Sequence, residues 1–208
     1  MSDDGAIDQI YAALVARELT AEDLSARRLA AFLGKTTGAI YHRWGSFDGL
    51  LFTVGQRGFV DLQARIEAVW AAKRELGPCA VAFVEFGLDH PEIYPLMFER
   101  RFDWAALRAA GYFERATPGS ALLACIVGLV RASGAEHPIP ETRLLMAGLH
   151  GLVSFASSGR MNTGDLSSSD RAVAIASARD LAARVCAAKA APKARSRRSK
   201  PKHPRARP

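Results

Sequence analysis

The chain has 208 residues, of which 49% are hydrophobic, and a formal net charge of +7 at pH 7. This length allows one large domain or two small ones with a sizeable core, and the composition excludes wholesale disorder. The charge is unevenly distributed, with −2 over residues 1–54, +1 over residues 55–190 and +8 over residues 191–208. The pI of about 9.7 therefore reflects the basic tail, not a folded part coated in basic side chains.

Helical periodicity begins close to the N-terminus. Apolar residues recur at i, i+3, i+4, i+7 and i+8 over residues 7–19, which predicts a first amphipathic helix. Ser25 is a suitable N-cap for a short second helix that stops at Gly34. Thr36 can cap a third helix, and Ser46 can cap a long amphipathic fourth helix.

The rest of the chain divides into helical segments at proline-rich and serine-rich breakers. The predicted segments are residues 79–89, 91–99, 103–114, 118–133, 140–159 and 168–190. No stretch alternates with period two between hairpin turns, so a sheet is not expected. The sequence thus predicts an all-α protein of about nine helices. Residues 191–208 contain eight basic residues and four prolines, and this tail is expected to be disordered.

Cysteine spacing and hydropathy bear on the compartment. The three cysteines, Cys79, Cys125 and Cys186, are far apart and form no CxxC pair, which argues against a disulfide framework or a zinc site. The acidic N-terminus lacks the layout of a signal peptide. The longest uncharged stretches, residues 116–130 and 144–159, fall short of the roughly 20 apolar residues of a membrane span. We expect a cytoplasmic protein without metal, cofactor or membrane contact.

Ala30, Gly34 and Ile40 have the spacing of a helix–turn–helix. Its first helix needs a small residue at the crossing, its turn needs a residue that tolerates positive φ, and its second helix needs an apolar anchor. The opposite face of the second helix would present Thr36, Thr37, Gly38, His42 and Arg43 to solvent. Residues 24–47 carry four basic side chains and no acidic one, which suits DNA. From spacing alone, a three-helix subdomain with a solvated charged face is the alternative.

The run LSARRLAAFLGKTTGAIYHRWGSFDGLL, residues 24–51, resembles the DNA-binding segment of the TetR family of transcriptional regulators. With the basic patch, this resemblance implies that the DNA-binding residues are Ser25, Arg27, Arg28, Lys35, Thr36, Thr37, Gly38, Ala39, Tyr41, His42 and Arg43. Three positions depart from the family pattern. Phe47 replaces a Lys, Lys35 replaces an apolar residue, and Arg43 replaces an aromatic residue. Lys35 and Arg43 could supply the missing phosphate contact, and the bases that are read stay open.

Residues 83–98 and 146–161 are similar to the ligand-binding domain of a TetR subgroup that usually carries Trp-His-Gly, with Leu149 here in place of the Trp. The resemblance implies an effector pocket, for which the candidates are Phe83, Phe86, Met97, Phe98, Trp104, Met146, His150 and Phe155. His150 is a candidate for a ligand contact or an interhelical hydrogen bond, and an ordinary core histidine is the alternative.

Small and apolar residues mark a possible dimer interface. The candidates are Gly148, Gly151 and Ser154 on one helix and Ile175, Leu181 and Val185 on the last one. In the TetR family two such helices from each subunit form a four-helix interface. A C₂ dimer would present two recognition helices to a pseudo-palindromic site. The alternative is that both helices only close the core of the monomer.

The resemblance implies a DNA-binding domain (residues 1–54), an effector-binding and dimerisation domain (residues 55–190) and a basic tail (residues 191–208). We expect a homodimeric repressor that leaves its operator when a small, largely apolar effector binds. A sequence-indifferent nucleic-acid binder dominated by the tail is the main alternative. An enzyme is not expected, because the chain lacks the Gly-x-Ser-x-Gly, His-Glu-x-x-His and phosphate-loop motifs.

Overall fold

The computed structural model describes residues 3–161 and 168–187. Over these ranges the chain forms ten α-helices, one short 3-10 helix and no strand, so the predicted all-α fold is confirmed. The elements are α1 (Asp3–Val15), the 3-10 helix η1 (Ala21–Asp23), α2 (Ala26–Phe32), α3 (Thr37–Trp44), α4 (Phe47–Lys73), α5 (Leu76–Asp89), α6 (Tyr94–Phe98), α7 (Trp104–Ala109), α8 (Pro118–Ala132), α9 (Pro138–Ser157) and α10 (Asp170–Ala187). None of the helices within the described ranges is both long and apolar enough to span a bilayer.

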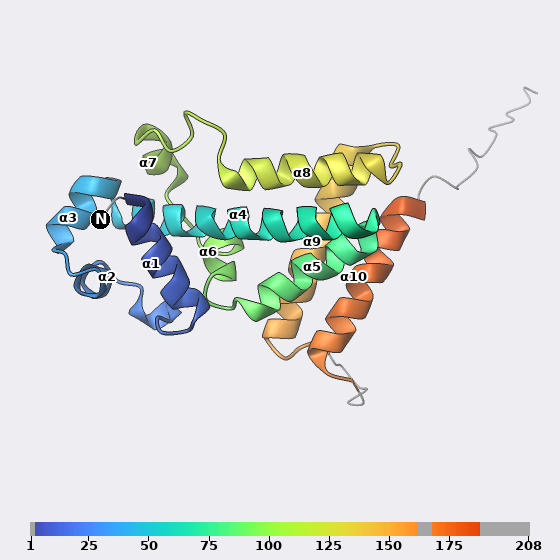
Figure 1. Ribbon diagram of the computed structural model, residues 1–208, viewed down its shortest axis with the longest axis horizontal. Coiled ribbons are helices and arrows are strands. Elements are labelled where there is room, and N and C mark those ends of the chain that lie inside the picture. The colour runs from blue at the N-terminus through green and yellow to red at the C-terminus, as the bar shows by residue number, and fades with distance from the viewer. Residues whose placement is uncertain (1–2, 162–167, 188–208) are drawn as a thin grey trace, which may run out of the picture.

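The 27-residue helix α4 is the axis around which the other elements are arranged (Figure 1). Helices α1, α2 and α3 gather around its N-terminal end, and α10 lies at the other end. Helix α8 runs alongside α4, which also packs against α5 and α6. At a rise of 1.5 Å per residue, α4 is about 40 Å long. It therefore connects the two ends of the molecule without a break.

Local capping explains where the N-terminal helices begin. The side chains of Ser25, Thr36 and Ser46 each accept a hydrogen bond from the backbone N–H three residues later, at N···O distances of 3.3, 3.2 and 2.9 Å. Gly34, at φ +63°, and Gly45, at φ +68°, follow α2 and α3 in a conformation that disfavours other residues. All three predicted N-caps are thus confirmed.

Helices α5 and α9 begin earlier than the sequence predicted, at Leu76 and Pro138 instead of residues 79 and 140. Pro78 and Pro140 were interpreted as breakers, yet each is the third residue of its helix. The N–H groups of the first helical turn have no acceptor inside the helix, so a proline there removes no hydrogen bond.

The segments predicted as helices over residues 91–99 and 103–114 are helical over only about half of their length. Helices α6 and α7 have only five and six residues, and Gly111, at φ +83°, lies in the turns that follow α7. We refer to residues 99–117 as the α7 segment. It lies on the same side of α4 as α8, near the first three helices (Figure 1).

Buried side chains form two clusters. The N-terminal cluster joins α1, α2, α3 and the first half of α4, and it also includes Ile93, Leu96, Phe102 and Leu107. The C-terminal cluster joins the second half of α4 with α5, α8, α9 and α10. The domain boundary after residue 54 stays a prediction. The expected basic tail lies outside the described residues.

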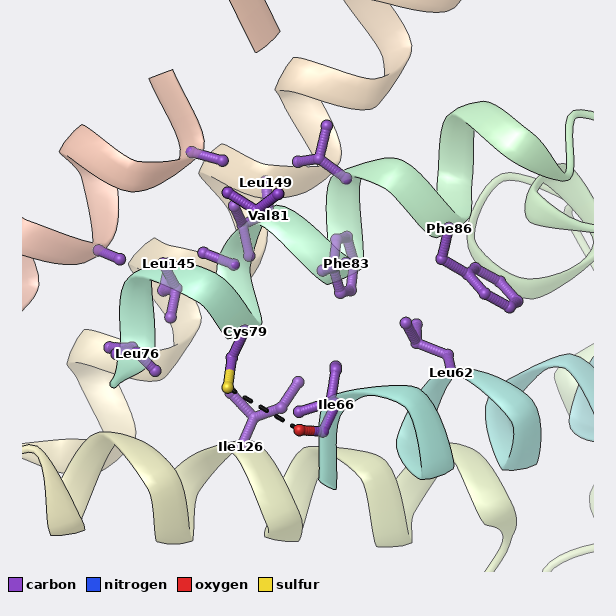
Figure 2. Close-up of a cluster of buried hydrophobic side chains, with 14 of the residues drawn as sticks. Leu62, Ile66, Leu76, Cys79, Val81, Phe83, Phe86, Ile126, Leu145 and Leu149 are labelled. Carbon is purple, nitrogen blue, oxygen red and sulfur yellow. Dashed lines mark hydrogen bonds between the residues drawn. The ribbon is translucent and has the colours of Figure 1, made fainter. Parts of the chain in front are cut away.

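Figure 2 shows the C-terminal cluster around α5. Phe83, from α5, and Leu149, from α9, meet above Ile66, from α4, while Ile126 of α8 closes the cluster from below. The Cys79 thiol donates to the carbonyl oxygen of Ile66, with an S···O distance of 3.8 Å. This thiol is therefore enclosed by apolar side chains from four helices.

Burial raises the pKa of Cys79 from 9.0 to about 11. We expect Cys79 in the folded chain to react with iodoacetamide at pH 8 at least ~100-fold more slowly than in urea, because only the thiolate attacks. Since the unfolded chain releases this proton at lower pH, the contribution of this thiol to stability falls as the pH rises from about 9 towards 11. Peptide mass analysis resolves each cysteine, and equal rates in both states would contradict the expectation.

Candidate functional site

Helices α2 and α3 form the predicted helix–turn–helix. Ala30 is buried in the N-terminal cluster, and Gly34 supplies the positive φ of the turn. Ile40 and Trp44, one helical turn apart, are buried and anchor α3 to the N-terminal cluster. The opposite face of α3 is left to solvent. Each of the three demands of the motif is therefore met by the residue that the spacing predicted.

All of the predicted DNA-binding residues lie on the exposed surface of this unit. They are Ser25, Arg27, Arg28, Lys35, Thr36, Thr37, Gly38, Ala39, Tyr41, His42 and Arg43. Tyr41 is 48% exposed although it is a large aromatic residue. The structure thus brings the residues together on one end of the molecule, at the N-terminus of α2, the turn and the outer face of α3.

One acidic residue borders this surface. Asp23 accepts from the guanidinium of Arg28, with an N···O distance of 3.2 Å. The N–H of Thr20 is the main cause of the lowered pKa of Asp23, so this carboxylate keeps its charge. Asp23 is one residue outside the stretch in which the sequence analysis counted four bases and no acid. The local field is therefore less positive near Arg28 than that count suggested.

Polar contacts from the α7 segment hold the end of α3. The hydroxyl of Tyr112 donates to the carbonyl oxygen of Trp44, the last residue of α3, at 2.8 Å. Arg100 pairs with Asp48 in the first turn of α4, at 2.9 Å. Gly49 lies beneath the first contact, where a Cβ atom would collide with both the Trp44 carbonyl and the Tyr112 hydroxyl. The position of α3 is thus coupled to the α7 segment.

An apolar cavity of about 300 Å³ lies between α4, α6, α8 and the same α7 segment. Its lining residues are Phe52, Gln56, Phe59, Leu96, Met97, Phe98, Phe102, Trp104, Phe113, Thr117, Gly119, Leu122, Leu123 and Met146. Trp104 and Leu123 are each about half exposed, so they mark the mouth of the cavity. The volume is at the lower end of the range for small-molecule sites.

Four of the eight predicted effector residues line this cavity: Met97, Phe98, Trp104 and Met146. The other four, Phe83, Phe86, His150 and Phe155, do not line it. Phe83 and Phe86 are buried in the C-terminal cluster, and Phe155 is 57% exposed on α9. Phe52, Gln56 and Phe59 line the cavity but were not among the predicted effector residues. Their i, i+4, i+7 spacing on α4 places them on one face, which is the signal that could have found them.

His150 makes the interhelical hydrogen bond that was one of its two predicted roles. Its Nδ1 lies 3.0 Å from the hydroxyl of Tyr94, and the two rings stack with their centroids 5.8 Å apart. Burial raises the pKa of Tyr94, so this hydroxyl stays protonated. Phe98, which lines the cavity, is the next ring, 6.0 Å from His150. His150 therefore links α9 to α6 behind the cavity wall.

The predicted dimer residues fall into two groups. Val185 is buried in the C-terminal cluster, and Ile175 and Leu181 pack against it. The structure places Gly148 against Leu181 of the same chain. The other small residues, Gly151 and Ser154, lie on the outer side of α9, where a Cβ at Gly151 would meet nothing within 4 Å. The first group contributes to packing within the chain, and the second is available to a partner.

No curated protein matches the chain. Among solved structures, a protein of unknown function from Rhodococcus sp. RHA1 is 21% identical, with a TM-score of 0.59 over 83% of this chain and 93% of that one. The "putative regulatory protein" SCO4313 is 17% identical, with a TM-score of 0.59 over 87% of this chain and 98% of that one. These likenesses show the fold alone. Residues 76–188, more than half of the chain, match the family model described as "Tetracyclin repressor-like, C-terminal domain". The chain therefore belongs to the TetR family of regulators.

Proposed function

We propose that this chain is a TetR-type transcriptional repressor that binds a pseudo-palindromic operator as a homodimer and releases it when a small apolar molecule binds. The observation that carries the proposal is the outer face of α3. Every residue expected there is exposed, while Ile40 and Trp44 fix the helix from behind. Such a regulator would act on DNA in the cytoplasm and would need no catalytic group.

The first turn of α3 suits close approach to DNA. Thr36 caps the helix, and the next three residues, Thr37, Gly38 and Ala39, have small side chains on the exposed surface. An α-helix fits the major groove of B-DNA, and N–H groups at a helix N-terminus favour phosphate. Lys35 in the turn adds an exposed positive charge beside that terminus.

A second copy would bind the outer face of α9. Leu144, Ala147, Gly151 and Phe155 lie at i, i+3, i+7 and i+11 on this face, and Leu144 and Phe155 are 68% and 57% exposed. Next to them is a groove of about 330 Å³ between α9 and α10, lined by Gly148, Leu152, Ser177, Asp180, Leu181 and Arg184. In a C₂ dimer the large side chains of one subunit would enter the groove of the other.

Binding of a ligand in the cavity could cause the release of DNA. A ligand inside it would touch Phe102 and Phe113 of the α7 segment, whose Tyr112 and Arg100 hold α3 and the start of α4. Binding that favours another position of this segment would shift the population away from the arrangement that fits DNA. The coupling would follow from these two polar contacts.

The test is a footprint of the full chain on the DNA upstream of its own gene, followed by genomic selection. We expect Tyr41→Ala to weaken binding to the selected site by roughly 10-fold, as the loss of one charge-assisted contact does, without changing the unfolding midpoint. Lys35→Ala should reduce the slope of log K against log salt by about 0.9. Lys73→Ala, exposed at the far end of α4, is the matched control. Absence of any protected site would refute the proposal.

The basic tail favours a second candidate, a sequence-indifferent nucleic-acid binder, because residues 191–208 carry eight basic residues and no acidic one. Removal of these residues separates the two functions. A specific repressor keeps its footprint and shows a smaller salt slope. If the truncated chain loses all DNA binding and no preferred sequence exists, the second function is correct.

A further inference from the structure

The cavity contains one amide whose orientation is fixed by the protein. The N–H of Gly119, in the first turn of α8, donates to Oε1 of Gln56 at 3.0 Å. This contact occupies the oxygen of the amide and leaves the two N–H bonds of Nε2, for which no described residue provides an acceptor. The other polar side chain of the lining, Thr117, accepts from the N–H of Ser120 at 3.3 Å and keeps one hydroxyl hydrogen. Gln56, with two N–H bonds, is therefore the main donor available to a ligand.

Aromatic rings lie on both sides of this donor. Phe52, one helical turn before Gln56, makes edge contacts with Phe102 and Phe113, at centroid distances of 5.8 and 5.4 Å. Phe59, one turn after it, makes an edge contact with Phe98 at 5.2 Å. Phe52 and Phe59 are seven positions apart on the helix, which corresponds to a rise of about 10 Å. The cavity thus has two ring-lined ends with an amide donor between them.

No ionisable side chain is among the described residues that line the cavity. A charged ligand would therefore lose its hydration without gaining an opposite charge, which is strongly unfavourable. A neutral ligand pays no such penalty, and a single acceptor near its centre would satisfy the N–H groups of Gln56.

From this geometry we propose that the cavity binds an uncharged molecule with two apolar, ring-sized halves joined by one hydrogen-bond acceptor, to which Nε2 of Gln56 donates. The inference rests on the proposed function only for the consequence of binding, which is release of DNA. The ligand class itself follows from the lining and can be measured without DNA.

Three probes of matched shape test the ligand class: benzophenone, diphenylmethane and protonated diphenylmethylamine. They share two phenyl rings and differ at the central atom, which carries a carbonyl, no polar group or a cation. Calorimetry on the full chain at pH 7 should give benzophenone a dissociation constant roughly 3- to 10-fold below that of diphenylmethane, the value of one hydrogen bond. The cation should bind at least ~100-fold more weakly than the ketone.

Variants at position 56 assign the discrimination to Gln56. In Gln56→Leu the ketone and the hydrocarbon should bind equally well, because the donor is gone. Gln56→Glu keeps an acceptor for Gly119 but replaces the donor by a carboxylate oxygen, so it should reverse the preference towards the cation. Gln63→Leu is the matched control, because Gln63 is on α4 and bonds to Glu67 outside this cavity. This control should leave all three dissociation constants unchanged.

Equal binding of benzophenone and diphenylmethane to the unmodified chain, uptake of the cation as tight as that of the ketone, or binding of none of the probes would overturn the ligand class. A footprint on DNA is scored separately. A chain that discriminates the probes as expected but protects no DNA refutes the proposed function and keeps the ligand class. A chain that protects DNA but does not discriminate the probes as expected refutes the ligand class and keeps the proposed function.

Discussion

Replacement of Gly49 by Ala is expected to abolish specific DNA binding and to lower the free energy of unfolding by about 1–3 kcal/mol, the range for overpacked sites. The added Cβ would collide with the carbonyl oxygen of Trp44 and the hydroxyl of Tyr112. Tyr112 could move away, but Trp44 contributes a backbone atom, so the connection between α3 and α4 must shift. The recognition helix would then leave the position that its buried anchor residues define.

Gly128→Ala is the control for this experiment. Gly128 lies in the interior of α8, and a Cβ there would meet nothing within 4 Å. Alanine is a better helix former than glycine, so this variant should gain up to about 1 kcal/mol and keep its footprint. Urea unfolding gives the stabilities, and footprint titration gives the affinities. A Gly49→Ala protein with the stability and affinity of the unmodified chain would show that the close approach at Gly49 has no role in placing α3.

Replacement of Phe52 by Ala is expected to lower the free energy of unfolding by about 3–5 kcal/mol and to remove benzophenone binding. Phe52 is 5% exposed and makes edge contacts with the rings of Phe102, Trp104, Tyr112 and Phe113, at centroid distances of 5.4 to 6.2 Å. Its loss enlarges the cavity and frees the α7 segment from α4. Both effects arise from one side chain because it belongs to the N-terminal cluster and to the cavity wall.

Trp104→Ala separates stability from ligand binding. Trp104 lines the same cavity but is 52% exposed at its mouth. Its side chain therefore has a smaller buried fraction than that of Phe52 in the folded chain, and its truncation should cost under about 2 kcal/mol. Benzophenone binding should still fall by roughly 10-fold, because one wall of the site is missing. If Phe52→Ala were no more destabilising than Trp104→Ala, the ring cluster around Phe52 would not hold the α7 segment.

The helix–turn–helix could be predicted from the sequence because its determinants are local. Ser25 and Thr36 each cap a helix through a bond to a residue three positions later, and Gly34 follows α2 directly. Such signals act over one turn of chain and depend little on the rest of the fold. The ion pair between Asp23 and Arg28 shows the limit of such local counting. Asp23 lies one residue before residues 24–47, the stretch over which charges were counted, so its effect on Arg28 was left out.

The cavity could be predicted only in part because it depends on residues far apart in the sequence. Met97 and Phe98 were found through the resemblance of their segment to the family. Phe102 precedes α7 and Phe113 follows its end at Ala109, so the helix predicted over residues 103–114 does not indicate which way either ring faces. The orientation of the Gln56 side-chain amide depends on its hydrogen bond from Gly119, 63 residues away in the sequence. A local sequence pattern cannot show that two residues so far apart come into contact in the folded chain.

The uninterrupted course of α4 affects whether residues 1–54 can fold on their own. Leu50 and Val54 belong to the N-terminal cluster and Leu62 and Ile66 to the other, on a single helix. Buried residues from positions 93–107 also complete the N-terminal cluster. A fragment ending at residue 54 would therefore keep its caps and its turn but lose four buried residues that cover its core, Ile93, Leu96, Phe102 and Leu107. We therefore expect residues 1–54 to be less stable alone than in the full chain, because part of their buried surface is covered by residues 93–107.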